Sequence, residues 1–223
     1  MLRALIFIPL FCVVSSGLAR AESFNLVELF VSQNCPACPA AQENLVELQE
    51  TDGPFIPLIW VIDYWDYVDE PDPMAIPESS TRQRVYADSL GIRGPYTPQL
   101  IVNGVAHVAG NRKRRVRSLL AEQRDLLEGE ESIATLDATS SSVSITGTED
   151  AGPQELWVMA LGPMQRYGLD MPNAVMKVTG PFYWAGGEME IDYTCDHRCV
   201  AVLQGIDRGP VSAVLAFEGE PPT

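Results

Sequence analysis

Two cysteines separated by two residues lie between an apolar segment and a segment of helical periodicity, and this arrangement restricts the fold most. The apolar run Phe24–Val31 predicts a buried strand. After Cys35 and Cys38, apolar residues recur at helical spacing as far as Leu48, with Pro36 expected in the first turn, where its missing N–H is harmless. We therefore expect the cysteine pair to open a helix that directly follows a strand.

The next elements predict a second strand and a second helix. Phe55–Ile62 is another apolar run, so the order strand, helix, strand predicts a parallel crossover. The segment 63–78 is rich in Asp, Tyr, Trp and Pro, which is typical of a long loop. The following helix is expected to start at Ser79–Thr81 and to stop at Gly91.

The remainder of this half predicts a hairpin and a last helix. Thr97-Pro98 leads into two apolar runs separated by Asn103-Gly104, a strong hairpin signal. Asn111 is expected to cap a helix over 112–127. This order of elements is the topology of a thioredoxin-like α/β domain, a mixed sheet flanked by helices.

The chain beyond residue 130 consists of short β-prone runs separated by turn signals, which predicts an all-β part. The runs are 133–138, 143–148, 156–161, 174–178, 189–193, 199–203 and 211–217. We expect a boundary near residue 131, with the thioredoxin-like domain over 22–130 and a small β-sandwich-like domain over 131–223.

The first 21 residues have the features of a secretory signal peptide. Arg3 precedes the apolar run Leu5–Val14, and Ala19-Arg20-Ala21 is a small-x-small cleavage site. The apolar run is shorter than the roughly 20 residues that cross a bilayer. We expect a periplasmic or secreted protein that begins at Glu22 and has no membrane insertion after cleavage. Cys12 is removed with the leader.

The net charge disfavours one class of function, and the number of cysteines favours another. The chain has 15 Lys and Arg against 30 Asp and Glu, and a net charge of −15 argues against a nucleic-acid binder. Without the leader, four cysteines remain: Cys35, Cys38, Cys195 and Cys199. An even number of paired cysteines in an exported protein favours disulfide chemistry.

A cysteine pair at the start of a helix has a direct chemical interpretation. The free N–H groups and the dipole of the first turn stabilise a thiolate, so Cys35 is expected to be the exposed nucleophile. Cys38, one turn along and more buried, would resolve the mixed disulfide. Thr97 and Pro98 are expected to form a cis-proline site that presents backbone groups to the substrate. No cofactor is needed.

Three further features have alternative interpretations. Glu28 is the only ionisable residue in its strand, and it is either a proton carrier beneath Cys38 or a solvated edge residue. Tyr64, Trp65 and Tyr67 either rim a substrate groove or clamp the loop that carries them. The basic run 112–117 is either a solvated helix face or a docking patch for an acidic partner.

The second cysteine pair lies at a predicted hairpin tip. A turn between Cys195 and Cys199 would allow a structural disulfide, a staple worth about 2 kcal/mol. The alternative is a second redox pair that exchanges with the first. Cys35 and Cys38 could also form a purely structural bridge. Cysteines together with His107 or His197 could instead bind a metal.

Several segments resemble a known bacterial family. The segments VELFVSQNCPACPAAQENLVEL, YWDY and TRQRVYADSLGIRGPYTPQLIVNG are similar to secreted thioredoxin-like proteins catalogued as domain of unknown function 1223. The resemblance covers residues 24–125, and beyond them only Asn173-Ala174-Val175 and the closing strands. It implies an exported thioredoxin-like domain fused to a β-rich one, with no settled activity. A basic Gly-Glu-Asn segment of the family is missing, so no C-terminal functional residue is carried over.

These features lead to two hypotheses. The first is an exported thiol–disulfide oxidoreductase that acts on protein or small thiols, with exported thiol- or disulfide-bearing proteins and a redox partner as its partners. The direction of exchange is not fixed by the Pro-Ala dipeptide between the cysteines. The alternative is a non-enzymatic periplasmic binding protein that uses either the aromatic-rimmed face or a cysteine site for copper or zinc.

Overall fold

The structure is a computed structural model that describes residues 25–128 and 131–219, so the expected leader over residues 1–21 lies outside the described residues. The first half of the chain contains β1 (Asn25–Val31), α1 (Cys38–Thr51), β2 (Phe55–Val61), α2 (Pro77–Ser89), β3 (Gln99–Val102), β4 (Ala106–Ala109) and α3 (Lys113–Leu127). The second half contains β5 (Ala134–Ala138), β6 (Ser142–Gly147), β7 (Gln154–Arg166), β8 (Leu169–Trp184), β9 (Gly187–Asp192), β10 (Arg198–Gly205) and β11 (Val211–Glu218).

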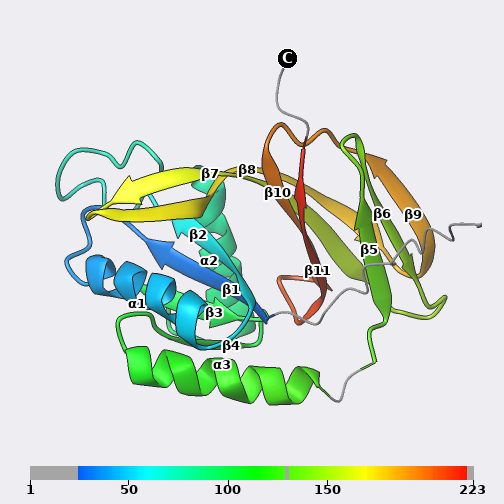
Figure 1. Cartoon of the computed structure of the whole chain (residues 1–223), viewed down its shortest axis with the longest axis horizontal. Helices are drawn as coiled ribbons and strands as arrows, with labels where there is room; N and C mark the ends of the chain where they lie inside the picture. Colours follow the sequence, from blue (N-terminus) through cyan, green and yellow to red (C-terminus); the bar gives the residue numbers. More distant parts are fainter. Residues whose placement is uncertain (1–24, 129–130, 220–223) are drawn as a thin grey trace, which may run out of the picture.

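Eight strands form one mixed sheet in the order β11-β10-β7-β8-β2-β1-β3-β4 (Figure 1). β1 and β2 are parallel, as the crossover predicts, and β3 is antiparallel to β1. The two halves of the chain meet where β8 runs parallel to β2, at the pair Ile59 and Ala174. Strands from both sides of residue 131 therefore share one sheet, and a second sheet contains β5, β6 and β9.

The large sheet is covered on both faces. α1 and α3 pack on one face, over Val27, Leu29 and Val31 of β1. α2 packs on the other face, where Leu26 and Phe30 lie in one cluster with side chains of β2, β7 and β10. The three-stranded sheet packs on β7 and β10 at the far end of the large sheet. The chain is thus a mixed α/β sheet with flanking helices.

The burial of β1 explains its composition. All seven residues of β1 are buried, because helices cover both faces of a central strand. A strand in this position contains apolar residues at successive positions and does not alternate with polar ones. Because β1 is fully buried, its one charged residue, Glu28, needs a partner inside the protein.

The helix starts differ from those expected. Pro39, not Pro36, occupies the first turn of α1, which begins at Cys38. α2 begins at Pro77, before the expected Ser79, because the fixed φ of proline suits the first helical turn. α3 has Arg112 at its N-cap, without a side-chain cap. None of these helices depends on the Ser, Thr or Asn caps that the sequence suggests.

The hairpin of β7 and β8 is longer than the sequence predicts. Its two-residue turn, Tyr167 and Gly168, has φ of 55° and 75°. Both values are left-handed, the geometry that matches the twist of paired strands. The hairpin therefore continues past the expected end of its strands and brings its tip to the loop between β1 and α1 (Figure 1).

Within residues 25–128 and 131–219, none of the helices combines the length and apolar character that crossing a bilayer requires.

Candidate functional site

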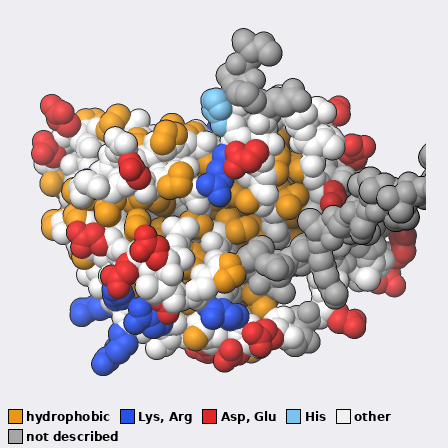
Figure 2. Space-filling model, viewed as in Figure 1, with side chains coloured by type: hydrophobic (Ala, Val, Ile, Leu, Met, Phe, Trp, Pro, Cys, Tyr) orange, Lys and Arg blue, Asp and Glu red, His pale blue; other side chains and the backbone are white. Residues whose placement is uncertain are grey.

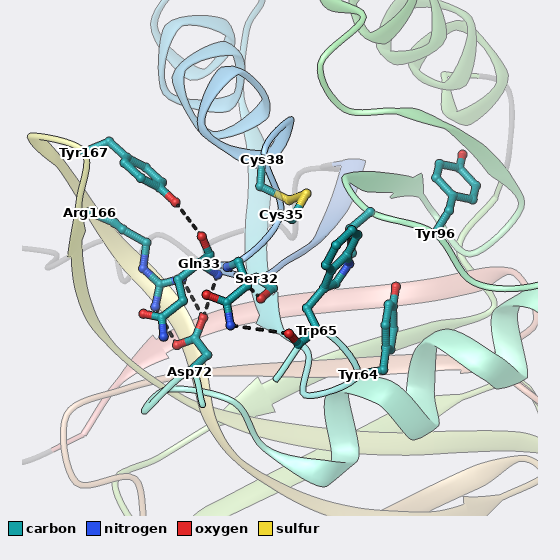
Figure 3. Close-up of a disulfide and its surroundings, with 12 residues drawn as sticks. Ser32, Gln33, Cys35, Cys38, Tyr64, Trp65, Asp72, Tyr96, Arg166 and Tyr167 are labelled. Carbon is teal, nitrogen blue, oxygen red and sulfur yellow. Dashed lines mark hydrogen bonds and ion pairs between the residues drawn. A yellow bond between two sulfur atoms is a disulfide. The ribbon is translucent and has the colours of Figure 1, made fainter. Parts of the chain in front are cut away.

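A disulfide joins Cys35 and Cys38 where β1 gives way to α1 (Figure 3). The two Cα atoms are 5.4 Å apart. The backbone N–H of Cys38, the first residue of α1, donates to the carbonyl oxygen of Cys35 at 3.1 Å. The N–H of Cys35 in turn donates to the carbonyl of Ser32 at 3.3 Å. The pair is thus held on a tight turn at the helix N-terminus.

The expectation that Cys35 is exposed is wrong. Its exposed fraction is 2%, and that of Cys38 is 0%. The cause is the loop between β2 and α2, whose Trp65 and Met74 pack against the apolar cluster that contains both cysteines. Figure 3 shows the Trp65 indole beside the disulfide. We call residues 63–76 the covering loop.

The covering loop is attached to the turn before β3. The indole N–H of Trp65 donates to the Thr97 hydroxyl at 2.7 Å. The Thr97-Pro98 peptide is cis, as expected, and the Pro98 carbonyl accepts from Gly110 N–H at 3.0 Å. A Cβ at Gly110 would lie 2.9 Å from Leu29 Cδ1 and 3.1 Å from Ala41 Cβ, so a side chain here would have to displace these core atoms. The cis-proline turn and the covering loop are therefore directly linked.

Asp72 is the main anchor of the covering loop. Its buried carboxylate receives two hydrogen bonds from the guanidinium of Arg166, at 2.7 and 2.8 Å. It also accepts the backbone N–H groups of Gln33 at 2.9 Å and Met74 at 3.1 Å. One side chain thus connects the β1–α1 turn, the covering loop and the tip of the β7–β8 hairpin (Figure 3).

The polar residues around this anchor form an open hollow of about 510 Å³ beside the cysteine turn. Asn34, the neighbour of Cys35, donates through Nδ2 to the carbonyls of Glu70 and Trp65. Gln33 Nε2 donates to the carbonyls of Glu70 and Pro71. The hollow is also lined by Asp69, Gln165, Arg166 and Tyr167. Side-chain amides therefore hold the backbone of the covering loop at its far end.

Tyr64 of the covering loop belongs to a second polar group, whose other members lie on α2, before β3 and on β4. The Tyr64 hydroxyl donates to Gln83 Oε1 at 3.0 Å, and Gln83 Nε2 donates to the Tyr96 carbonyl at 2.8 Å. Burial raises the pKa of Tyr64 to about 12. The Tyr96 hydroxyl lies 2.9 Å from His107 Nδ1, and partial burial raises the pKa of Tyr96 and lowers that of His107.

The aromatic residues named in the sequence therefore lie on the covering loop itself. Trp65 and Tyr67 stack with their ring centroids 6.4 Å apart. Tyr67 is exposed, whereas Trp65 and Tyr64 are partly buried. In this arrangement Tyr64 and Trp65 hold the loop in place.

Glu28 lies on the opposite face of the sheet from the cysteines. Its side chain is on the α2 side, where Arg82 Nε donates to its carboxylate at 2.5 Å and the Tyr86 hydroxyl also donates to it. At 1% exposure it is not a solvated edge residue either. Both interpretations of Glu28 are therefore corrected: strand alternation turns it away from Cys38 and into a buried ion pair.

Cys195 and Cys199 also form a disulfide, with Cα atoms 6.1 Å apart. Both residues are buried in the cluster between the large sheet and the three-stranded sheet. Cys35 and Cys38 belong to a different cluster, under α1. The two pairs are thus built into separate parts of the molecule.

The basic run at the start of α3 is partly engaged in ion pairs. Lys113 contacts Glu47, and Arg117 Nε lies 2.6 Å from Asp52 Oδ1. Lys and Arg side chains gather at the lower left in Figure 2, where α1 and α3 lie in Figure 1. Part of this run therefore connects the two helices instead of facing solvent alone.

The metal-binding alternative lacks a ligand cluster among the described residues. Over residues 25–128 and 131–219, His, Cys, Asp and Glu side chains do not gather in groups of three or more that could hold a metal ion. The copper or zinc interpretation then depends on the cysteine pairs alone.

The sequence interpretation missed Asp72 and Arg166. Asp72 lies in a segment that contains many acids, and nothing local distinguishes it. The dipeptide Tyr167-Gly168, between polar residues of two β-prone runs, was the available signal for the hairpin that delivers Arg166.

Comparisons with known proteins place the chain among proteins without an assigned activity. The model of the family described as "Protein of unknown function (DUF1223)" matches residues 26–169. None of the curated proteins matches the sequence.

Two solved structures share the arrangement of elements. A crystal structure of a protein from Agrobacterium tumefaciens has a TM-score of 0.73 and 25% identity, covering 91% of this chain and 98% of that chain. The protein HBP35 of Porphyromonas gingivalis has a TM-score of 0.66 and 12% identity, covering 92% of this chain and 78% of that chain. The second likeness concerns the fold alone.

Proposed function

The chain belongs to the DUF1223 family of proteins of unknown function, and we propose that it is an exported thiol–disulfide oxidoreductase that acts through Cys35 and Cys38. The observation that carries the proposal is the Cys35–Cys38 disulfide on the turn between β1 and the first residue of α1. A helix N-terminus stabilises a thiolate, and a two-residue spacing lets each sulfur reach the other.

The proposal includes a thioredoxin-like assignment for the first half of the chain. The order β1, α1, β2, α2, the cis Thr97-Pro98 turn, the β3–β4 hairpin and α3 supports it. We assign the end formed by β5, β6, β9 and the facing strands as the small β-sandwich-like part. The boundary near residue 131 and the export signal over residues 1–21 are proposed with it.

The exchange reaction balances without a cofactor. The Cys35 thiolate attacks one sulfur of a substrate disulfide, which forms a mixed disulfide and releases a substrate thiolate. The Cys38 thiolate then attacks Cys35 Sγ, releases the second substrate thiolate and closes the Cys35–Cys38 bond. The substrate gains two electrons and the cysteine pair loses two. The reverse sequence oxidises a dithiol substrate.

The covering loop must move for this reaction to occur. Both cysteines are buried beneath it, and the Trp65 indole is bound to the Thr97 side chain. In the proposal a substrate displaces Trp65, and the backbone beside Thr97 and Pro98 then orients the substrate chain. The partners are exported proteins that carry thiols or disulfides, together with a redox partner in the periplasm or outside the cell.

Trapping of a mixed disulfide tests the proposal. With Cys38→Ser the second step is blocked, so Cys35 should accumulate mixed disulfides when the protein is offered a disulfide-bonded protein substrate. The matched control, Cys35→Ser, should accumulate far fewer. Mass spectrometry of the linked peptides identifies the sulfur used.

One result would overturn the assignment. That result is the absence of any mixed disulfide at Cys35 in the Cys38→Ser variant, although alkylation in denaturant shows that the Cys35 thiol is free. The pair would then be a structural bridge.

A further inference from the structure

We propose that the exposed face of α3 pairs with α3 of a second copy of this chain, with the two helices antiparallel. The core side of α3 contains Val116, Leu120 and Gln123, which are buried. The opposite side of the helix faces solvent at the lower edge of the molecule in Figure 1. The proposal is argued from this face alone and does not rest on the exchange reaction.

Four exposed residues form a straight stripe along this face: Arg114, Ser118, Ala121 and Asp125. Their spacing of four, three and four residues places them in one row on a helix. The two residues in the middle are small, so the backbone of a second helix can come close there. The two residues at the ends carry opposite charges. Such a stripe is complementary to a copy of itself that is turned end for end.

The charges of α3 are arranged against its own dipole. Its first turn contains basic residues and no acid, although the N-terminus of a helix favours negative charge. Asp125 lies in the last turn, where the dipole favours positive charge, and it lies three residues from a second acid, Glu122. Figure 2 shows Lys and Arg gathered at the lower left and acids to their right along the lower edge. A single copy of α3 is therefore destabilised by its own exposed charges.

These charges also lack partners within the chain. Among the described residues, Arg114, Arg115, Glu122 and Asp125 take part in none of the ion pairs. Neither arginine has an acid three or four residues along the helix. The basic residues on the α1 side of the helix, in contrast, are paired with acids of α1 and its C-cap. The unpaired charges are thus confined to the outer face.

An antiparallel second copy would pair these groups symmetrically. With a two-fold axis through the middle of the stripe, Arg114 of each copy faces Asp125 of the other. Arg115 and Glu122 flank the same stripe, and the axis brings each of them beside the other residue of the second copy. The two helix dipoles then run in opposite directions, which is also favourable. Every contact occurs twice, because the axis repeats it.

The expected dimer is weak and reversible. One helix from each copy makes an interface at the small end of specific interfaces, below about 1,200 Å². The net charge of −15 on each chain also opposes association. We therefore expect a Kd of the order of 100 µM. An anionic membrane fits this face less well, because it would place Glu122 and Asp125 against charges of their own sign.

Charge reversal followed by analytical ultracentrifugation tests the pairing. The wild type should show a monomer–dimer equilibrium between about 10 µM and about 1 mM. Arg114→Asp should raise the Kd at least about tenfold, because it turns two attractive contacts into repulsive ones. Asp125→Arg should do the same, although it brings the net charge closer to zero. The matched control is Arg93→Asp, an equal charge change in the exposed connection from α2 to β3, which should alter the Kd less than about twofold.

Two combinations should restore the dimer. The double variant Arg114→Asp with Asp125→Arg exchanges the charges and keeps the net charge, so its Kd should return to within about threefold of the wild type. A mixture of the two single variants should form a mixed dimer, because each variant supplies the charge that the other lacks. Circular dichroism establishes that every variant is folded.

The proposal is overturned if the wild type remains monomeric up to about 1 mM. If that monomer sediments with phosphatidylglycerol vesicles, the face belongs to a membrane surface instead. The proposal is also overturned if Arg114→Asp dimerises as well as the wild type, or if the double variant dimerises no better than the single ones. None of these outcomes depends on the reactivity of Cys35.

Discussion

At the level of single residues, the Asp72 carboxylate anchors the loop that covers the disulfide. Its side chain is completely buried, and its partner Arg166 is 12% exposed. A buried charge that loses its partner is costly, because the remaining ion is neither solvated nor paired. Removing one partner of this pair should therefore cost more unfolding free energy than removing one partner of an exposed ion pair.

Replacing Arg166 should uncover the cysteines. Arg166→Gln leaves Asp72 without its two charged donors, so we expect the unfolding free energy to fall by about 3 kcal/mol. We also expect dithiothreitol to reduce the Cys35–Cys38 bond at least about tenfold faster, because the covering loop opens more often. Timed alkylation and mass spectrometry measure the reduction rate.

An exposed ion pair supplies the control for this variant. Arg198 and Glu218 lie 3.6 Å apart, and both are well exposed. Arg198→Gln should change the unfolding free energy by less than about 1 kcal/mol and leave the reduction rate unaltered. Equal reduction rates in Arg166→Gln and the wild type would show that the covering loop is not what protects the bond.

His107 makes the unfolding free energy depend on pH. Partial burial lowers its pKa, so the unfolded chain binds this proton more tightly than the folded chain. The stability associated with neutral His107 is present above the unfolded value of about 6.5 and is lost as pH falls through the lower folded value. Urea unfolding should therefore show the wild type losing stability relative to His107→Gln as pH falls from about 7.5 to about 5.

At the level of secondary structure elements, strand alternation decides the role of Glu28. Neighbours in β1 point to opposite faces, so the residue that contacts Arg82 cannot also lie beneath Cys38. The ion pair joins the central strand to α2, and Gln204 extends it to β10. Its contribution is therefore to the packing of α2 on the sheet.

Because Glu28 lies in this ion pair and away from the cysteines, replacing it should change the stability of the protein but not the reactivity of Cys35. Glu28→Gln leaves the Arg82 charge buried without its partner, so the unfolding free energy should drop by about 3 kcal/mol or more. The pH profile of Cys35 alkylation in the reduced, folded protein should stay the same. A shifted profile would mean that Glu28 exchanges protons with the cysteines after all.

Elements with strong local periodicity could be predicted from the sequence. The loops that cover them, and the residues with which their side chains pair, could not. The apolar runs identify β1 and β2, and Asn103-Gly104 identifies the β3–β4 hairpin because both residues adopt left-handed φ. The burial of Cys35 could not be predicted, since it depends on Trp65 in a loop. The Asp72–Arg166 pair joins residues from different halves of the chain, and no local pattern encodes such a contact.

At the level of the whole molecule, the second disulfide belongs to the packing between the two sheets. Closing the short loop between Cys195 and Cys199 contributes about 2 kcal/mol in the chain-entropy model. The double variant Cys195→Ala with Cys199→Ala should lose about that much unfolding free energy in urea. Its rate of exchange at Cys35 should match that of the wild type, and a slower rate would support a relay between the pairs.

The shared sheet also predicts how a shortened chain behaves. Ending the chain after residue 130 would expose Leu58, Trp60 and Ile62, which pack against side chains of β7 and β10. It would also leave β2 without its neighbour β8. We expect this fragment to aggregate, as size-exclusion chromatography would reveal. A monomeric fragment with cooperative unfolding would instead show that residues 22–130 fold independently.

The tip of the β7–β8 hairpin places Arg166, from the second half of the chain, against the loop that covers the Cys35–Cys38 disulfide. Both halves of the chain therefore contribute to the burial of that disulfide: the first supplies the covering loop, and the second supplies the arginine that anchors it.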